Sequence, residues 1–268
     1  MTSRFGGYEE QEFIAEFYDS EYEHLRSKSK DVDFYLDCSK GTDGRTLELG
    51  CGTGRVLIPT ASSGYEITGL DLSPYMLMKC REKLDKQVVE VQQRVKLVQG
   101  NMTDFETGET YSLVTIPFRP FQHLISAEEQ KDCLKCVNRH LAPDGLFVFD
   151  VFNPFPPRLV DNPEYKVERE DLPETQLPDG RKLRRTNRIT AFHRDLQYND
   201  IELIYYVTHP DGNMERLVQS FPMRYFFRYE MEHLLELCGF RIVELFGDFE
   251  RSEFSVDSPD MIFVAEKK

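Results

Sequence analysis

Apolar and polar residues follow a pattern along residues 46–152 that predicts strands and helices in alternation. Apolar runs typical of buried strands lie at 46–49, 66–70, 95–98, 111–116 and 145–152. Helical spacing separates them at 55–61, after Ser73-Pro74 and after the capping box that runs from Ser126 to Glu129. A turn is expected at 142–145. Strands that alternate with helices predict a parallel sheet with helices on both faces.

The pattern differs on either side of this region. Before it, residues 9–25 form a helical stripe with Phe13, Ile14, Phe17 and Tyr18, and 31–36 predict a second helix. After Asn153, strand-like alternation at 185–192, 201–208 and 214–223 is separated by turn signals at 178–180 and 210–212, which indicates antiparallel strands. A helix at 229–238, ended by Gly239, and strands at 241–245 and 261–265 complete the chain.

Composition narrows the classes of protein. With 40% hydrophobic residues, 20 Phe and 13 Tyr, the 268-residue chain can bury a large core. A formal net charge of −14 disfavours a nucleic-acid partner, because Lys and Arg supply most affinity for phosphate backbones. No apolar run approaches the roughly 18 residues of a membrane span, and we expect no secretory signal peptide at the N-terminus. Six scattered cysteines fit reduced thiols, so we expect a cytoplasmic protein.

A glycine-rich loop follows the first predicted strand, in the segment LELGCGTGR at 47–55. Glycines let a ligand approach the backbone, and the start of the following helix offers free N–H groups. Asp71 stands 21 residues after Gly50, at the end of the second strand, where a carboxylate can accept both hydroxyls of a ribose. The loop reads G-x-G-x-G with Arg55 next, whereas dinucleotide sites use G-x-G-x-x-G, so a nicotinamide-dependent oxidoreductase is the weaker alternative.

Four ordered segments carry a resemblance to class I S-adenosylmethionine-dependent methyltransferases. They are LELGCGTGR, GLDLS at 69–73, VQGNMTDF at 98–105 and YSLVTIPF at 111–118, and the pattern is nearest to small-molecule N-methyltransferases of the glycine and sugar-amine type. The resemblance implies an α/β fold, a Rossmann-like seven-stranded mostly parallel sheet flanked by helices, with an antiparallel β insertion after the fifth strand. We divide the chain into an N-terminal helical lid (1–40), a cofactor-binding core (41–155), an acceptor-side insertion (156–226) and a C-terminal completion of the core (227–268).

The resemblance also implies a set of cofactor contacts. Backbone groups of the glycine loop would bind the methionine part of S-adenosyl-L-methionine, Asp71 the ribose, and Leu72 and Asn101 the adenine. Glu48 would support the loop from the strand end. The full expected set comprises Tyr18, Tyr22, Glu48, Gly50, Cys51, Gly52, Gly54, Asp71, Leu72, Asn101, Met102, Ile116 and Pro117.

Catalytic and substrate residues are expected near the segment PFRPFQH at 117–123. His123 is the candidate base there, and PFQHL resembles a segment of sugar-amine N-methyltransferases in which a histidine faces the acceptor. The alternative is a histidine that caps the next helix or bonds a backbone carbonyl. Tyr18 resembles a lid tyrosine, with plain core packing as the alternative. Arg119, Asn153 and Arg224 are candidate substrate contacts; for Arg224 the alternative is pairing with Glu230 or Glu232.

One feature is set aside. Cys133, Cys136 and His140 share one side of a helix, but no second pair completes a zinc set, so we expect no metal.

We expect methyl transfer to a small molecule, with an amine as a candidate acceptor. No nucleic-acid or membrane partner is expected, and monomer and homodimer stay open. A non-catalytic cofactor-binding or partner-binding protein is a further alternative.

Overall fold

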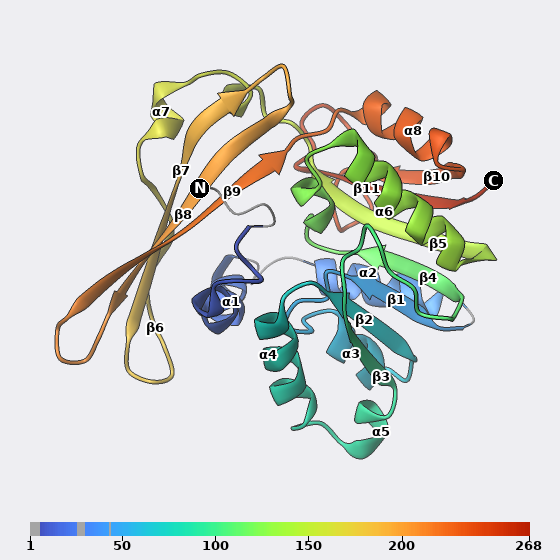
Figure 1. Ribbon diagram of the computed structural model, residues 1–268, viewed down its shortest axis with the longest axis horizontal. Coiled ribbons are helices and arrows are strands. Elements are labelled where there is room, and N and C mark those ends of the chain that lie inside the picture. Colours follow the sequence, from blue (N-terminus) through green and yellow to red (C-terminus); the bar gives the residue numbers. More distant parts are fainter. Residues whose placement is uncertain (1–5, 26–29, 43) are drawn as a thin grey trace.

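The computed structural model describes residues 6–25, 30–42 and 44–268. A seven-stranded sheet has the order β10-β11-β5-β4-β1-β2-β3. All its neighbouring strands are parallel except β11, which runs antiparallel to β5 and β10. The strands are β1 Thr46–Leu49, β2 Ile67–Asp71, β3 Val95–Gln99, β4 Tyr111–Ile116, β5 Leu141–Phe152, β10 Phe240–Phe246 and β11 Asp260–Lys267. The predicted mostly parallel sheet is confirmed (Figure 1).

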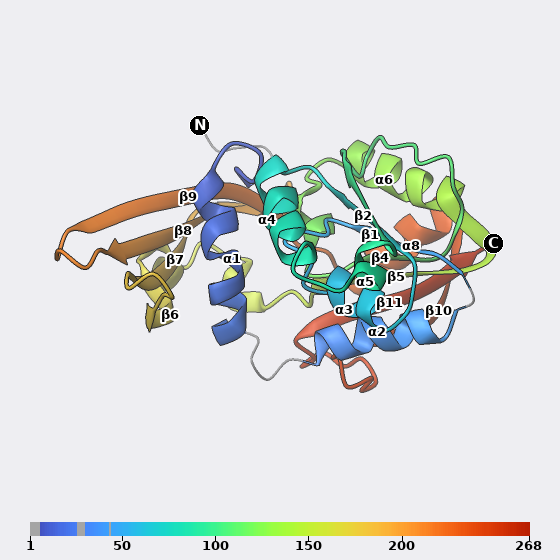
Figure 2. The ribbon, with the colours of Figure 1, turned by 90° about the horizontal axis from the view of Figure 1, so that it is seen from below.

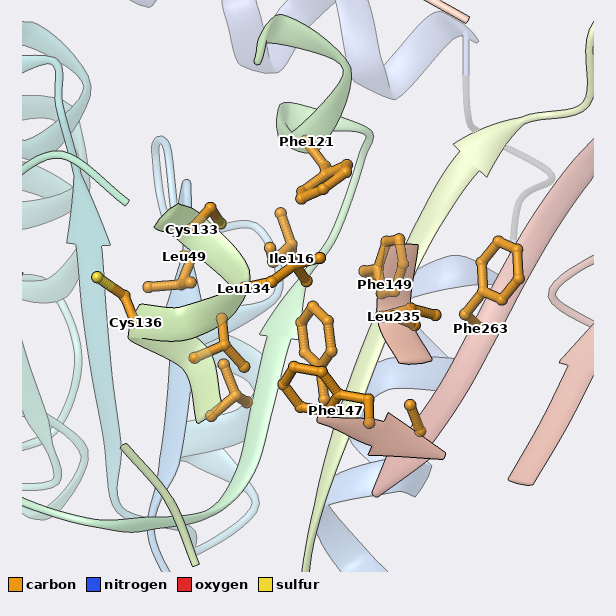
Figure 3. Packing of buried hydrophobic residues seen from close by; sticks show 14 of the residues in the cluster. Leu49, Ile116, Phe121, Cys133, Leu134, Cys136, Phe147, Phe149, Leu235 and Phe263 are labelled. Carbon is orange, nitrogen blue, oxygen red and sulfur yellow. The ribbon is translucent and has the colours of Figure 1, made fainter. Parts of the chain in front are cut away.

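Helices cover both faces of this sheet (Figure 2). On one face, α6 (Ala127–His140) and α8 (Arg228–Leu237) bury Leu134 and Leu235 against Phe147 and Phe263, as Figure 3 shows. On the other face, α2 (Asp31–Lys40) packs against Leu113. The short helices α3 (Leu57–Ser62), α4 (Pro74–Leu84) and α5 (Val89–Gln92) form a third apolar cluster beside β2. Alternate strand residues therefore face different helical layers, as a doubly covered sheet requires.

A separate four-stranded antiparallel sheet has the order β6-β7-β8-β9. Its strands are β6 Arg169–Gln176, β7 Lys182–His193, β8 Tyr198–Thr208 and β9 Met214–Arg224. The predicted turns at 178–180 and 210–212 join them, and their glycines have φ of 90° and 86°, which glycine adopts without strain. Two short helical segments, Pro156–Arg158 and α7 (Pro163–Lys166), lead from β5 into this sheet.

The first helix, α1 (Glu12–Leu25), lies between the two sheets (Figure 1). Phe17 packs against β6, β7 and β8 through Leu172, Leu183 and Tyr205. Ile14 packs against Met76 of α4. The helix thereby connects the antiparallel sheet to the glycine loop's side of the main sheet.

The sequence pattern missed some details. Strand β6 and helices α5 and α7 were not individually expected. The turn expected at 142–145 is wrong, because these residues belong to β5. Tyr111 pairs with Leu141 and Leu113 with Leu146, so the extra residues of β5 are taken up as a bulge opposite Ser112. None of the helices in the described part of the chain has the length and apolar character needed to cross a membrane.

Candidate active site

The site lies where the carboxyl ends of β1, β2 and β4 meet. The chain passes from β1 to β2 on one side and places β4 on the other, so a crevice opens between β1 and β4. Gly50 follows β1 with a φ of 69°. A Cβ on Gly50 would lie 2.8 Å from Cγ of Pro120 in the segment after β4, so the two loops can meet only through glycine. The space that a side chain at position 50 would need is therefore taken partly by Pro120 of the protein itself.

A cavity of about 110 Å³, which we call the loop cavity, lies against this glycine loop. Helix α1 contributes Tyr18 and Tyr22 to its lining, and the strand ends contribute a carboxylate, an amide and apolar side chains. Of the residues predicted for the site, Tyr18, Tyr22, Gly50, Gly52, Asp71, Leu72, Asn101, Met102 and His123 line it. Tyr8, Met76, Phe118, Pro120 and Leu124 also line it and were not predicted.

Asp71 connects the glycine loop to the next strand. Its carboxylate accepts a hydrogen bond from the Gly52 amide at 2.7 Å and one from the Ser73 amide at 2.8 Å. Burial raises the pKa of Asp71 to about 6, although these backbone donors oppose the shift. The carboxylate is therefore charged at neutral pH and begins to take up a proton as the pH falls through about 6.

Glu48 lies beneath the loop at the end of β1 and lines neither of the cavities described in this section. Its side chain is 2% exposed, and its Oε2 has no hydrogen-bond partner among the described residues. Burial raises its pKa well above the ordinary value, and the nearby Arg55 guanidinium opposes that shift. A buried carboxyl with an unsatisfied oxygen is costly unless a donor arrives.

Besides Glu48, four predicted cofactor residues lie outside the lining of the loop cavity. Cys51 packs among α3 and α4, and a Cβ on Gly54 would lie 2.7 Å from Sγ of Cys80 in α4. Ile116 is fully buried in the main core, and Pro117 is buried beside it. Phe118 and Pro120, which follow them, line the cavity instead. Any ligand contact of the four would have to come through their backbone.

The segment after β4 has an unusual backbone. Phe118 and Arg119 both have a φ of 68°, and a short 3-10 helix, Pro120–His123, follows. Two successive non-glycine residues in the left-handed region store strain, which proteins tolerate mainly at functional sites. A hydrogen bond of 2.9 Å from the Phe118 amide to Asp150 holds this turn in place. The turn directs Phe118 and His123 to the loop cavity.

A second cavity of about 420 Å³, which we call the sheet cavity, opens between the antiparallel sheet and the loop cavity. The two cavities adjoin, because both are lined by five residues: Tyr8, Tyr18, Tyr22, Phe118 and His123. The volume of the sheet cavity lies within the range of roughly 300–1,000 Å³ that is typical of small-molecule sites. All four predicted substrate residues, Arg119, His123, Asn153 and Arg224, line it.

Three of those predicted substrate residues already bind other parts of the protein. Arg119 is buried, pairs with Asp260 and stacks on Phe152 at 3.5 Å. The Asn153 side-chain amide donates to two backbone carbonyls, at 3.0 and 2.8 Å. Arg224 pairs with Glu230 at 2.9 Å, which is the alternative considered for it. These groups shape the cavity wall whether or not they also touch a substrate.

His123 stands at the junction of the two cavities. Its ring lies 5.8 Å from that of Tyr8 and 5.3 Å from that of Phe221, centroid to centroid. Nδ1 has no hydrogen-bond partner in the described part of the chain, so this nitrogen does not cap the following helix. Ser126 caps that helix instead. Burial lowers the pKa of His123 to about 4, and the imidazole is neutral at pH 7.

Helix α1 is fastened over the glycine loop by a polar contact. Asp19 accepts a hydrogen bond of 2.6 Å from the Thr53 hydroxyl and pairs with Lys83 of α4 at 2.8 Å. This contact holds Tyr18 and Tyr22, whose rings lie 4.5 Å apart, against both cavities. Burial raises the pKa of Tyr18 well above its ordinary value, so the phenol keeps its proton.

A buried charged cluster in the sheet cavity was missed by the sequence analysis. Glu21 of α1 pairs with Arg185 of β7, which also holds Asp171 of β6 through two hydrogen bonds of 3.1 and 2.9 Å. All three residues line the sheet cavity. One signal was present: Glu21 continues the apolar stripe of α1, four positions after Phe17, where a charged residue is unexpected.

The two cysteines and the histidine set aside earlier lie elsewhere. Cys133 and Cys136 belong to the main apolar core. Both ring nitrogens of His140 have protein partners, Cys136 O at 2.8 Å and Glu106 at 3.1 Å. Across residues 6–25, 30–42 and 44–268, the structure contains no group of three or more His, Cys, Asp or Glu side chains that could hold a metal ion.

Comparison with known proteins gives consistent matches. Residues 46–145 match the methyltransferase domain family. The chain is 25% identical over 236 residues to the cypemycin N-terminal methyltransferase of a Streptomyces species, covering 87% of this chain and 88% of that one. It is 27% identical to the dTDP-3-amino-3,6-dideoxy-alpha-D-glucopyranose N,N-dimethyltransferase of Streptomyces fradiae, covering 73% and 69%. Among solved structures, the CcbJ methyltransferase of Streptomyces caelestis is similar with a TM-score of 0.76 and 25% identity, over 99% of each chain.

Proposed function

We propose that this chain, whose residues 46–145 match the methyltransferase domain family, is an S-adenosylmethionine-dependent methyltransferase that methylates a nitrogen of a small molecule bound in the sheet cavity. The observation that carries the proposal is the pair of adjoining cavities. One lies against the glycine loop and Asp71, the other is larger and lies under the antiparallel sheet, and His123 and Tyr18 line both. Such an arrangement brings a cofactor and an acceptor together at one junction.

The residues that line the loop cavity suit S-adenosyl-L-methionine. A Cβ on Gly52 would meet only Tyr18, at 3.9 Å, so the backbone there is open to a ligand. Asp71 would accept the ribose hydroxyls, while Leu72, Asn101 and Met102 would contact the adenine. The cofactor supplies a methyl group on a cationic sulfur, ready for in-line displacement. Glu48, whose buried Oε2 has no donor within the described ranges, would support the loop near the ammonium end.

His123 and Tyr18 would position the acceptor. A neutral imidazole does not repel a cationic sulfonium, and its Nδ1 is free to accept a hydrogen bond from an amine N–H. The proton released by the methylated nitrogen would then pass to the imidazole or to water. Tyr18, kept neutral by burial, would close the site from α1.

The chemical class of the acceptor is proposed from the cavity and from the relatives. The sheet cavity is lined mainly by aromatic and polar side chains, which suits a polar small molecule with an apolar face. One relative is named as an N-terminal methyltransferase of cypemycin, and another as an N,N-dimethyltransferase of a dTDP-linked amino sugar. We also propose the cytoplasm as the location, since all six cysteines are free thiols. The four-part division given above, from lid to C-terminal completion, is kept as a proposal.

The function is tested by ligand stabilisation followed by an acceptor screen. S-adenosylmethionine and S-adenosylhomocysteine are expected to raise the melting temperature, and NAD is not, because only a ligand of the native state stabilises it. Amino sugars, other small amines and their hydroxyl counterparts are then incubated with labelled S-adenosylmethionine. We expect a product heavier by one CH₂ from an amine, with the label on nitrogen. Stabilisation by NAD alone, or label confined to hydroxyl acceptors, would overturn the proposal.

A further inference from the structure

Glu21 places a carboxylate in the sheet cavity. It comes from α1, one turn after Tyr18, and its side chain is 3% exposed. Arg185 binds its Oε2, while Oε1 is buried with no hydrogen-bond partner in the part of the chain that the structure describes. A buried carboxylate oxygen left without a donor costs free energy, which a bound donor would recover.

The charges around Glu21 do not balance. Arg185 carries one positive charge but contacts two carboxylates, those of Glu21 and Asp171. The other arginines that line the cavity have different partners. Arg119 pairs with Asp260 and Arg224 pairs with Glu230. Arg158 is exposed and stacks on Tyr165. The cluster therefore has surplus negative charge, and a cation that enters the cavity would favour the charged form of Glu21.

The surroundings of Glu21 also suit a cation. Tyr205 packs on the same helix. Three aromatic residues, Tyr8, Tyr205 and Phe221, line the cavity. The faces of aromatic rings attract ammonium groups electrostatically. Burial raises the pKa of Glu21 to about 7, although Arg185 and the Tyr205 hydroxyl oppose the shift, and a cation beside the carboxylate would oppose it further.

We propose that Glu21 binds a positively charged nitrogen of the acceptor, other than the neutral nitrogen that takes the methyl group, and so makes this enzyme select cationic amines over neutral molecules of the same shape. Asp171 holds Arg185, and Arg185 fixes the Glu21 carboxylate through Oε2, so that Oε1 is left for the ligand. The inference rests on the proposed function, because it takes the sheet cavity to be the acceptor site.

The test is calorimetric titration of the protein saturated with S-adenosylhomocysteine, using benzylamine and its neutral counterpart benzyl alcohol as probes. We expect the wild type to bind benzylamine at least roughly 10-fold more tightly, as a charge-assisted hydrogen bond implies. Glu21→Gln should remove this preference, and Glu21→Asp should retain part of it. The matched control is Glu16→Gln, on the same helix, which replaces an exposed carboxylate paired with Arg181 and should keep the full preference.

Each outcome bears on one claim. Equal binding of the two probes by the wild type, or no measurable binding of either, would overturn the role of Glu21 even if the variants fail to fold. Unchanged preference in a folded Glu21→Gln protein would overturn it as well. Failure of S-adenosylhomocysteine to bind at all would instead contradict the proposed function, so the two failures are distinguishable.

Discussion

Replacing Asp71 by alanine is expected to weaken S-adenosylmethionine binding by about 1.5–3 kcal/mol, which is roughly 10- to 150-fold in Kd. The carboxylate lines the loop cavity and also holds the Gly52 amide at 2.7 Å. The variant therefore loses both the proposed ribose acceptor and an anchor of the glycine loop. Isothermal titration with S-adenosylhomocysteine measures the loss. The control is Asp104→Ala, an exposed carboxylate outside the cavity lining.

Asp71 should also make folding stability and cofactor affinity depend on pH. Burial raises the pKa of Asp71 to about 6, above its unfolded value of about 3.9. The native state thus takes up a proton between pH 6 and 4 that the unfolded state does not, so protonation of Asp71 favours folding as the pH falls through this window. Cofactor affinity should fall as the pH falls through the same window, because protonated Asp71 no longer offers a charged acceptor to the ribose hydroxyls. Wild-type affinity that is flat from pH 7.5 to about 5, or unchanged affinity in Asp71→Ala, would show that the ribose is bound elsewhere.

Replacing His123 by alanine is expected to slow turnover by roughly 10- to 100-fold while leaving cofactor affinity nearly intact. The expected loss is smaller than is usual for a general base, because displacement from a sulfonium depends mainly on positioning. His123 stands at the junction of the cavities, and its Nδ1 has no hydrogen-bond partner among the residues that the structure describes. Single-turnover rates with a saturating amine acceptor measure the effect, and His123→Asn separates hydrogen bonding from proton uptake.

The pH profile distinguishes the two possible roles of His123. With its pKa lowered to about 4, the imidazole stays neutral above pH 5, so a rate increase between pH 6 and 9 should report deprotonation of the acceptor amine. An Asn variant as active as the wild type, with the same rise of rate with pH, would show that His123 is only a spacer. A wild-type profile with an inflection near 6.5 that disappears in the variant would contradict the lowered pKa.

The part of the site that the sequence predicted is the part built from one continuous strand–loop–helix unit. Gly50, Gly52 and Asp71 are found by spacing because parallel strands bring their carboxyl ends to one edge. The side chain of Ile116, which is also predicted to contact the cofactor, is buried in the core. The left-handed turn at Phe118 and Arg119 redirects the chain just after it. No local pattern announces two successive positive φ values at non-glycine residues.

The acceptor side was less predictable for a different reason. Glu21 and Arg185 are 164 residues apart in sequence, and neither belongs to a motif. Their pairing depends on how α1 packs against the antiparallel sheet, which the alternation of 185–192 predicts in kind but not in position. Arg224 illustrates the converse: its place beside aromatic residues suggested a substrate contact, and Glu230, one of the two alternative partners considered, binds it. Tertiary placement decides such side chains.

The most direct test of the account is a crystal structure of the protein with S-adenosylhomocysteine bound. We expect the ribose at Asp71, the adenine against Leu72, Asn101 and Met102, and the sulfur at the junction lined by Tyr18 and His123, facing the sheet cavity. Ligand density outside the loop cavity, or a sulfur turned away from the sheet cavity, would contradict the claim that these two cavities hold the cofactor and the acceptor.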